Sequence, residues 1–290
     1  MLNFDAIHTF CTIVDLGNFR KAAQKLHRTQ PAISQQLKKL EQEVGHILLD
    51  RKLRKPTPEG EILYHKGKEL LRHAKNIHRE IEDTSQSPRR ELRVGTSDTN
   101  ALYFLPPYVS LFMDQWPEVK LEIFSQSTNR IATQVIEGKL DLGIITLPLT
   151  RPELETLTLY EQRLVLVLPN EHPLANKKSI SLNQLKNESF VLLNESTRTG
   201  SLIHNFFAEH QFNPKVNMYS GSFEVIKRYI AQGIGISFLP EMGVPKEATK
   251  NLTTVRINKM PKVGIGAILQ TDSYQHKAAQ AFLELLQSRL

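Results

Sequence analysis

The chain has 290 residues, and 40% of them are hydrophobic, which is enough for packed cores in about two domains. The 37 Lys and Arg residues outnumber the 30 Asp and Glu residues, so the net charge is +7. The single cysteine, Cys11, excludes an internal disulfide, a CxxC redox pair and a Cys-rich zinc site. The N-terminus lacks the pattern of a secretory signal, and no stretch approaches the roughly 18 apolar residues of a membrane helix, so we expect a cytoplasmic protein with no membrane partner.

The positive charge is concentrated near the N-terminus. Residues 1–90 hold 17 Lys and Arg against 11 Asp and Glu, a net charge of +6, whereas residues 91–290 hold 20 against 19. Within residues 20–55 the balance is ten basic to three acidic residues. A run of charge is often only a solvated surface. A compact basic segment joined to a near-neutral remainder is also what a polyanion-binding domain shows, because neutralising phosphates releases counterions.

The first 45 residues have the apolar spacing of three successive helices. The first ends at Gly17, and the second begins near Phe19. The third has Thr29 as its cap and Pro31 in its first turn. One face of this third helix carries hydrogen-bond donors and no carboxylate, because side chains four residues apart share a face. The residues on it are Gln30, Ser34 and Lys38, with Gln35 and Lys39 beside them.

A short hairpin and a long helix are expected next. The hairpin follows the apolar residues 47–49 and carries basic side chains within 51–55. The helix starts at Thr57-Pro58 and ends near Asp83, before a polar linker at residues 84–88. Its apolar residues recur in a heptad, which favours a seam for a partner helix; packing on its own domain is the alternative. The seam consists of Leu63, Gly67, Leu70, Ala74, Ile77 and Ile81.

From Glu91 onward the pattern changes to short apolar strands that alternate with helices. This alternation indicates an α/β domain with a mostly parallel sheet. Helices are expected, for example, at residues 128–138 and 201–210, and a closing helix at 274–290. The expected strands span residues 92–95, 119–124, 140–145, 163–168, 190–193, 215–219, 234–239, 252–257 and 264–270.

Two segments carry a recognisable pattern, FRKAAQKL at residues 19–26 and TQPAISQQL at 29–37. Further pieces follow in order, including LE at 40–41, VG at 44–45, WP at 116–117, HPL at 172–174 and GIGI at 233–236. Together they resemble the LysR-type transcriptional regulators over the whole chain. The departures are Leu49, where the family usually has phenylalanine, and the segment PTPEG at 56–60, where the family has a Leu-Thr-x-Ala-Gly pattern.

The resemblance implies an α/β protein with an all-α N-terminal head. A winged helix-turn-helix would span residues 1–57, a linker helix for dimerisation 58–88, and a two-lobed α/β effector domain of the periplasmic-binding-protein type 91–290. The first lobe would span 91–165 and 269–290, the second 166–268, with chain crossings near 164–168 and 266–270. The resemblance also implies a homodimer or homotetramer that binds double-stranded DNA at a roughly palindromic operator.

By the same resemblance the third helix enters the major groove. Amide and hydroxyl side chains can bond base edges there, and basic side chains can hold phosphates. The alternative role of Pro31 is only to start the helix. The alternative for Lys39 and Lys52 is that they belong only to a solvated surface. The positions that match the family's DNA-facing residues are Gln30, Pro31, Ser34, Gln35 and Lys38, with Arg51 and Arg54 in the wing.

The strand-to-helix turns of the second part are rich in hydroxyl groups. Ligands of open α/β sheets lie at the carboxyl ends of strands, beside helix N-termini that favour anions. The turns are similar to those of the branch that regulates sulfur assimilation, which implies a small anionic or carboxylate-bearing effector, sulfate or an amino-acid derivative, between the lobes. Helix capping is the alternative for each hydroxyl, and Asp98 opposes a simple anion site. The expected donors are Ser97, Thr99, Asn100, Ser127, Thr146, Thr197 and Thr199.

Two other classes of protein are weighed against this interpretation. An enzyme is disfavoured because G-x-S-x-G, H-E-x-x-H and P-loop motifs are absent and Cys11 lies on an apolar helix stripe. The histidines of the long helix lack the four-residue spacing of a helical metal site, so neither a metal nor a cofactor is expected. The other class is a small-molecule binding protein without a DNA-reading role, which the basic head and the missing signal peptide oppose.

Overall fold

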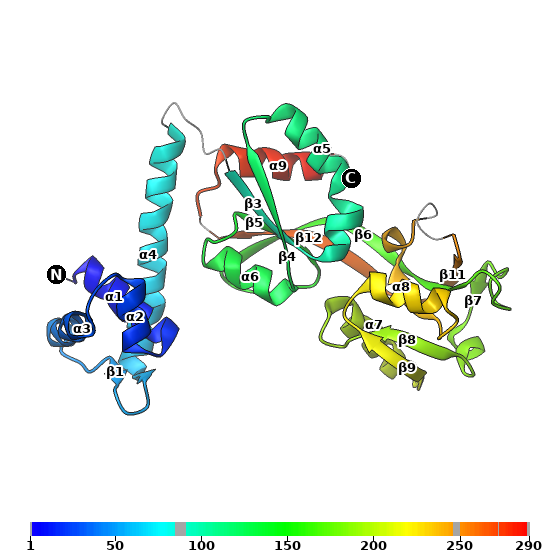
Figure 1. Cartoon of the computed structure of the whole chain (residues 1–290), viewed down its shortest axis with the longest axis horizontal. Coiled ribbons are helices and arrows are strands. Elements are labelled where there is room, and N and C mark those ends of the chain that lie inside the picture. The colour runs from blue at the N-terminus through cyan, green and yellow to red at the C-terminus, as the bar shows by residue number, and fades with distance from the viewer. Residues whose placement is uncertain (1, 85–90, 246–249, 272, 289–290) are drawn as a thin grey trace. The chain divides into compact units, whose positions relative to one another are not determined.

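The computed structural model describes residues 2–84, 91–245, 250–271 and 273–288 (Figure 1). The chain forms two compact units, which divide between Thr84 and Ser85. The predicted polar linker at 84–88 lies, beyond Thr84, outside the described residues. In the part of the chain that the structure describes, no helix is long and apolar enough to span a membrane.

The N-terminal unit begins with three helices whose ends are set by local capping. Asn3 and Asn18 accept hydrogen bonds from the first backbone N–H groups of the first two helices, and Thr29 caps the third. The first helix ends at Gly17 and the third at Gly45, both in the left-handed conformation that suits glycine. The three helices are α1 (Phe4–Leu16), α2 (Phe19–Lys25) and α3 (Gln30–Val44).

One hydrophobic core holds these helices together. Its central side chains, such as Phe10, Ile33 and Leu37, are fully buried, and burying a side chain of this size contributes roughly 1.5–3 kcal/mol. Because Ile33, Leu37 and Leu40 occupy one stripe of α3, the opposite stripe is left to solvent. The buried members of the core are Ala6, Ile7, Phe10, Cys11, Ile13, Ala22, Ala23, Ile33, Leu37, Leu40, Leu48 and Leu49.

A two-stranded wing and the long helix α4 complete the unit, as predicted. β1 (Leu49–Asp50) pairs antiparallel with β2 (Lys55–Pro56). Within the turn between them, Asp50 Oδ1 accepts hydrogen bonds from the backbone N–H groups of Lys52 and Leu53. α4 (Pro58–Thr84) starts where Thr57 Oγ1 accepts a hydrogen bond from the Gly60 N–H at 3.0 Å.

The first half of α4 packs on α1. A Cβ atom at Gly67 would lie 2.7 Å from Ile7 Cγ2 and 3.0 Å from Cys11 Sγ, so the two helices approach closely at this glycine. Leu63 is half-buried against the same core. Leu63 and Gly67 are thus covered in part by α1 of the same unit, and their place in a seam for a partner helix stays a prediction. Heptad spacing identifies the apolar face of a helix but not the surface that covers it.

Farther along α4 the apolar side chains are exposed. Leu70, Ile77 and Ile81 are 46%, 58% and 62% exposed, and Ala74 is half-buried. Single exposed apolar residues are ordinary, but several in a row on one helix mark an interaction surface. The seam predicted from the heptad therefore has exposed apolar side chains beyond Gly67, and the seam itself stays a prediction.

Cys11 is a packed core residue. Burial raises the pKa of its thiol to about 12, because the low-dielectric surroundings disfavour the thiolate. Its Sγ lies 3.9 Å from the Tyr64 carbonyl oxygen on α4. The thiol therefore stays protonated at neutral pH, which agrees with its interpretation as a packing group between α1 and α4.

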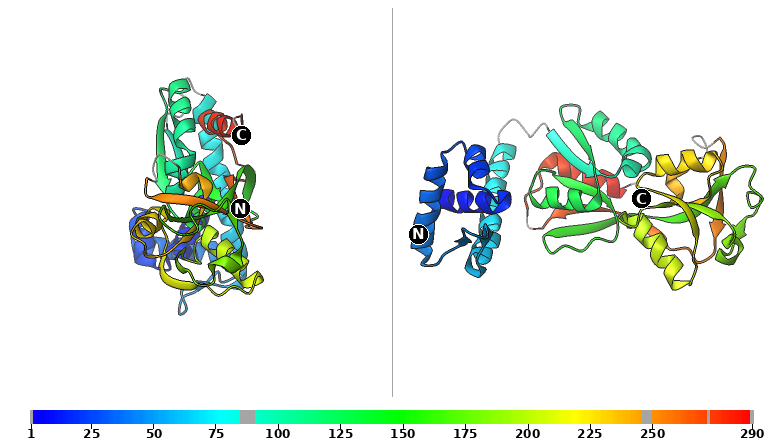
Figure 2. Two further views of the ribbon diagram at one scale, coloured as in Figure 1. Left: turned by 90° about the vertical axis from the view of Figure 1, so that its right-hand side faces the viewer. Right: turned by 60° about the horizontal axis from the view of Figure 1, so that its bottom comes forward.

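The C-terminal unit has two lobes. In the first lobe β3, β4 and β5 pair in parallel, and β12 joins β5 antiparallel. Figure 1 shows α6 on one face of this sheet and α5 with α9 on the other, and Figure 2 shows the red α9 beside the sheet from a second side. The elements are β3 (Glu91–Thr96), the π-helical turn η1 (Asn100–Phe104), α5 (Pro106–Gln115), β4 (Lys120–Ser125), α6 (Thr128–Ile136), β5 (Leu142–Thr146), β12 (Lys262–Gln270) and α9 (Lys277–Ser288).

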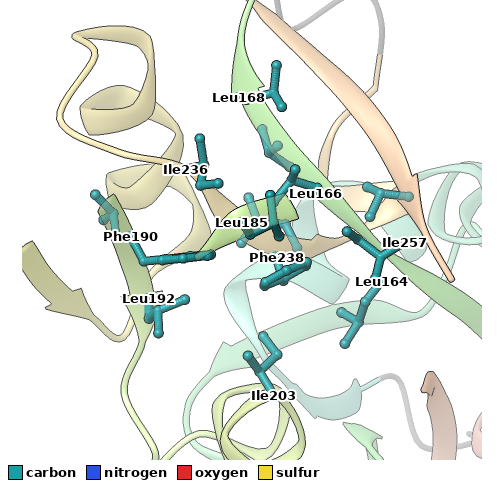
Figure 3. Packing of buried hydrophobic residues seen from close by; sticks show 14 of the residues in the cluster. Leu164, Leu166, Leu168, Leu185, Phe190, Leu192, Ile203, Ile236, Phe238 and Ile257 are labelled. Atoms are coloured by element: carbon teal, nitrogen blue, oxygen red, sulfur yellow. The ribbon is translucent and has the colours of Figure 1, made fainter. Parts of the chain in front are cut away.

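The second lobe is built around a separate core (Figure 3). Phe190 and Phe238 stack at its centre with ring centroids 6.0 Å apart, and leucine side chains of β6 surround them. The elements are the second half of β6 (Leu154–Pro169), β7 (Ser179–Ile180), η2 (Leu182–Leu185), β8 (Ser189–Leu193), α7 (Arg198–Glu209), β9 (Lys215–Ser220), α8 (Phe223–Ala231), β10 (Ser237–Pro240), η3 (Glu241–Gly243) and β11 (Leu252–Ile257).

Two strands, β6 and β12, connect the lobes (Figure 1). β6 pairs with β12 up to Arg163 and with β10 and β11 from Leu164 onward. Val263 belongs to the core of the second lobe and Ile265 to that of the first, so the return crossing lies near residue 264, earlier than the predicted 266–270. Both strands run antiparallel to their neighbours, so the prediction of a mostly parallel sheet is wrong at the crossings.

Candidate functional site

A cavity of about 580 Å³ lies between the two lobes. The turns that follow β3 and β4 and the last residue of β5 line it from the first lobe, and the starts of α7 and α8 line it from the second. Open α/β sheets hold their ligands at such strand-to-helix turns. All seven residues that were expected to bind an effector line this cavity, namely Ser97, Thr99, Asn100, Ser127, Thr146, Thr197 and Thr199. The structure brings the set together, and its ligand role stays a prediction.

Hydrogen bonds fix the turn after β3. Thr96 Oγ1 donates to the Ile144 carbonyl oxygen at 2.9 Å, and Asn100 Nδ2 reaches the same oxygen at 3.4 Å. The Asn100 N–H donates to Ser97 Oγ at 3.3 Å. Ser97 and Asn100 therefore hold the backbone of the turn, so part of their hydrogen-bonding capacity is already used by the fold.

Ser127, at the start of α6, differs from Thr197 at the start of α7 and from Ser222 at the start of α8, whose side chains cap their helices. It occupies the N-cap position of α6, but its side chain makes no capping hydrogen bond. The first N–H groups of a helix have no partner within the helix. Because Ser127 and Thr128 both line the cavity, this helix start offers a hydroxyl and backbone donors there.

The start of α7 is held against the end of β8. Thr197 Oγ1 accepts a hydrogen bond from the Gly200 N–H at 3.0 Å and donates to the Asn194 carbonyl oxygen at 2.8 Å. A Cβ atom at Gly200 would lie 2.0 Å from that same oxygen, so only glycine fits here. Thr197 thus caps α7, the role that was the alternative to ligand binding for each hydroxyl residue. Thr199 is buried in the wall of the cavity.

Three charged side chains line the cavity, namely Asp98, Arg198 and Glu224. Asp98 accepts a short hydrogen bond from the Ser125 hydroxyl within the first lobe. Arg198 Nη2, at the start of α7, lies 3.4 Å from Asn129 Oδ1 at the start of α6, so this contact spans the two lobes. Arg198 is the only cation among the lining residues that the structure describes.

A second contact between the lobes lies at the edge of the cavity. Tyr103 Oη, from η1, donates to Glu224 Oε1 at 2.6 Å and accepts from Lys227 Nζ at 2.6 Å, both on α8. Lys227 Nζ also bonds Glu224 Oε1 at 2.7 Å and the Gly243 carbonyl oxygen at 2.9 Å, and Lys227 is buried. Burial, and then the hydrogen bond to Glu224, raises the pKa of Tyr103. Its hydroxyl therefore keeps the proton that it donates.

Several lining residues are absent from the predicted set, namely Gln126, Asn129, Gln162 and Arg198. Asn129 and Arg198 lie in the first turns of α6 and α7, so the rule that selected Ser127 and Thr197 would have found them. Gln126 Oε1 is buried and has no hydrogen-bond partner among the described residues. Gln162 is bonded to Met242 across the lobes, a contact that no local sequence signal indicates.

The predicted DNA-facing residues lie on the solvent side of the N-terminal unit. Ser34 is half-exposed and the others are exposed, in keeping with an α3 stripe opposite the core. In the wing, Arg51 Nη2 lies 3.7 Å from Glu41 Oε2, and Arg54 has a positive φ of 54°. The complete set is Gln30, Pro31, Ser34, Gln35, Lys38, Arg51 and Arg54.

Among the described residues, no three His, Cys, Asp or Glu side chains are grouped to hold a metal ion.

The family described as the LysR substrate binding domain matches residues 85–290, and the bacterial regulatory helix-turn-helix protein of the lysR family matches residues 4–61. The chain belongs to the LysR family of transcriptional regulators. Its N-terminal unit is the family's DNA-binding head, and its C-terminal unit is the effector-binding domain.

Curated members of the LysR family match most of the chain. The HTH-type transcriptional regulator CysL of Bacillus subtilis (strain 168) is 29% identical over 258 residues, 88% of this chain and 86% of the relative. A probable RuBisCO transcriptional regulator of Cyanophora paradoxa is 31% identical over 278 residues, 92% of this chain and 86% of the relative.

Solved LysR-family structures share the fold. A full-length OxyR variant from Pseudomonas aeruginosa has a TM-score of 0.71 at 24% identity and covers 99% of this chain and 94% of its own. Full-length BenM has a TM-score of 0.60 at 25% identity, with 98% and 95% covered. The effector binding domain of QuiR in complex with shikimate has a TM-score of 0.62 at 24% identity, with 69% and 96% covered.

The contact of Tyr103 with Glu224 and Lys227 predicts the behaviour of Tyr103→Phe. We expect the free energy of unfolding of the effector domain to fall by about 1–3 kcal/mol, because the change deletes a hydroxyl that bonds two charged groups while keeping the ring. Hydrogen exchange followed by mass spectrometry should become faster in residues 100–104 and 223–231. Tyr219→Phe, at an exposed tyrosine of β9, is the control, and equal exchange in the two variants would contradict the prediction.

Proposed function

We propose that a small anionic or carboxylate-bearing molecule binds between the lobes of the effector domain and controls how this regulator binds DNA. The observation that carries the proposal is the cavity itself. Hydroxyl groups and the starts of three helices, α6, α7 and α8, surround one space of about 580 Å³. A helix N-terminus carries a partial positive charge and unpaired N–H donors, so three of them around one cavity favour an anion.

The charges around the cavity refine the class of ligand. Glu224 is already paired with Lys227, so Arg198 and the neutral donors supply the attraction for an anionic group. Asp98 adds negative charge on the first-lobe side, where it suits an amine or a hydroxyl of the same ligand. A small molecule with one carboxylate and a polar end fits both features. The cavity volume falls in the range of small-molecule sites.

The effector acts by stabilising one arrangement of the lobes. Donors from both lobes can bond one ligand only at a particular distance between the lobes. Ligand binding therefore favours that distance over others. A ligand shifts such an equilibrium only by its difference in affinity for the two states. In an assembly of several chains, the arrangement of the lobes then sets the spacing of the DNA-binding heads.

The DNA-binding head uses α3 as its recognition helix in this proposal. Gln30 and Gln35 present an amide donor and acceptor to base edges, and Pro31 packs on a thymine methyl. Ser34 and Lys38 hold phosphates or bases, and Arg51 and Arg54 bring the wing to the backbone. The exposed donor-rich face of α3 supports this assignment, since the helix buries only its opposite stripe.

The exposed part of α4 joins two chains in this proposal. Leu70, Ala74, Ile77 and Ile81 form the seam, and a homodimer or homotetramer places two heads on one DNA molecule. Two identical heads related by a two-fold axis read two half-sites in opposite directions, so the operator is roughly palindromic. The operator duplex can be selected by the protein itself from random sequences.

The effector proposal predicts thermal stabilisation of the full chain by a ligand of the stated class. Sulfate, phosphate, small carboxylates and amino-acid derivatives are screened one at a time. Ligand at about 100 times its Kd adds roughly 2.7 kcal/mol, which raises Tm by about 5–10 °C for a domain of this size. Ser127→Ala should weaken the shift without lowering the Tm of the free protein, because Ser127 makes no capping hydrogen bond.

The matched control for this screen is Ser110→Ala, at an exposed serine of α5 outside the cavity lining. It should respond to each ligand as the wild-type protein does. Absence of stabilisation by every compound of these classes would overturn the anionic-effector proposal. A shift that Ser127→Ala and Ser110→Ala retain equally would place the binding site elsewhere.

The recognition face predicts the effect of Ser34→Glu. A carboxylate on this face meets the phosphates of DNA, so affinity for the selected operator should fall by roughly 100-fold or more. Circular dichroism and sedimentation should match the wild-type protein, because Ser34 is outside the core. His65→Glu, on the exposed side of α4, is the control for the added charge. Retained operator affinity would show that another face of the head reads DNA.

The seam predicts the effect of Leu70→Lys. A charged side chain buried between two α4 helices lacks a partner, so self-association and operator affinity should fall together by about tenfold or more. Sedimentation and gel shift measure the two quantities on the same samples. His65→Lys is the control, since at about 100° per residue it lies about 140° around the helix from Leu70. Unchanged sedimentation of Leu70→Lys would refute this seam.

A further inference from the structure

A network of hydrogen bonds joins α1, the turn before α3 and α3 itself. Asp5 Oδ2 accepts from Arg28 Nη2 at 2.8 Å and from Gln36 Nε2 at 2.7 Å. Gln36 Oε1 accepts from Arg28 Nη1 at 2.6 Å and from Thr9 Oγ1 at 2.9 Å. Two nitrogen atoms of the Arg28 guanidinium are thus bound by two different neighbours, which fixes the plane of the group.

The backbone of Arg28 is equally well defined. His27 adopts a positive φ of 53°, which turns the chain between α2 and α3, and the Arg28 N–H donates to the Ala23 carbonyl oxygen at 2.9 Å. Thr29, the next residue, is the N-cap of α3. Arg28 therefore lies immediately before the recognition helix, on a turn that both helix ends determine.

The fixed guanidinium retains unused donors. Arginine has five N–H groups in one plane, and the bonds to Asp5 and Gln36 use two of them. The Arg28 side chain is 37% exposed, so part of it is accessible from solvent. A planar fork of this kind matches the geometry of a phosphate, and little rotamer freedom is lost when it binds.

Arg28 lines a groove beside α3. Two charged residues line this groove in the described part of the chain, Arg28 and Lys39, and both are basic. Gln35, which belongs to the proposed DNA-facing set, lies in the same groove, so the groove borders the recognition face. The lining consists of Arg28, Thr29, Ala32, Gln35, Gln36 and Lys39.

We propose that this groove binds a backbone phosphate of the DNA, with Arg28 as an oriented donor and Lys39 as a second cation. The argument is the coincidence of two cations, a helix N-terminus and a bordering base-reading residue in one groove. The proposal rests on the placement of the α3 face on DNA, which Ser34→Glu tests separately. Arg28 lies outside the set of DNA-binding residues derived above.

Asp5 is a positioning residue in this arrangement. The hydrogen bond from Arg28 is the main reason that the pKa of the Asp5 carboxyl lies below its usual value, so the carboxylate stays ionised at neutral pH. Asp5 is not part of the groove lining. It holds Nη2 of Arg28 while Gln36 holds Nη1, and three N–H groups of the guanidinium remain for the phosphate.

The test is the salt dependence of DNA binding by full-length Arg28→Ala and Lys39→Ala. The probes are the selected operator and an unrelated duplex of equal length. Each lost phosphate contact should reduce the slope of log K against log salt by about 0.9 for each bound head. When the salt concentration rises from 50 to 200 mM, the ratio of the wild-type affinity to the variant's affinity should therefore fall about 3.5-fold per head, equally on both duplexes.

Four further results keep the test decisive. Lys186→Ala, an exposed lysine of the second lobe, should leave the slope unchanged. If Arg28→Ala loses helix content, Lys39→Ala still reports on the groove, because Lys39 has no part in the network. An unchanged slope in both groove variants would overturn the proposal. A loss confined to the operator, with an unchanged slope on the unrelated duplex, would overturn it in favour of a base contact.

Discussion

The antiparallel pairing of β6 with β12 is the constraint on which the effector domain depends. The pairing runs from Leu154 to Arg163 on β6, and the same strand then carries β10 and β11 of the second lobe. Gln162 and Val263, at the two crossings, line the cavity. The lobes are thus joined by strands that also line the cavity, whereas the remaining lining residues belong to one lobe or the other. A rotation of one lobe about the crossings therefore changes the distance between these two sets of lining residues.

The contacts that join the two lobes beside the cavity come from the same helices as the predicted ligand donors. Thr99 and Asn100 lead into η1, which carries Tyr103, and α8 carries Glu224 and Lys227 directly after its cap. Arg198 and Asn129, in the first turns of α7 and α6, make another cross-lobe contact. A ligand that engages these helix starts therefore acts on the same short segments that hold the lobes together. Binding and lobe arrangement are coupled through one or two helical turns.

Local signals predicted the helix ends of the head and the residues that line the cavity, whereas they did not predict the packing partners. Thr29, Gly17 and Gly45 set helix ends by chemistry within a few residues, and strand-to-helix turns located the cavity. Leu63 was assigned to a seam although it packs in part on the core of its own unit, because a heptad is the same whether α1 or a second chain covers it. The first half of β6 was missed because its polar residues pair with β12, about 100 residues away, rather than forming an apolar run.

The two parts of the chain recognise their ligands by different physics. The head concentrates positive charge, but the net charge of +6 over residues 1–90 counts Arg28 and Asp5 as if they were independent. Their direct bond offsets one charge with the other and instead gives Arg28 a fixed orientation. Charge steers the head to any DNA, and only oriented groups can distinguish one register on it from another. The effector domain is nearly neutral, so under the proposed function its selectivity would come from hydroxyls, helix starts and Arg198, the only cation among the described lining residues.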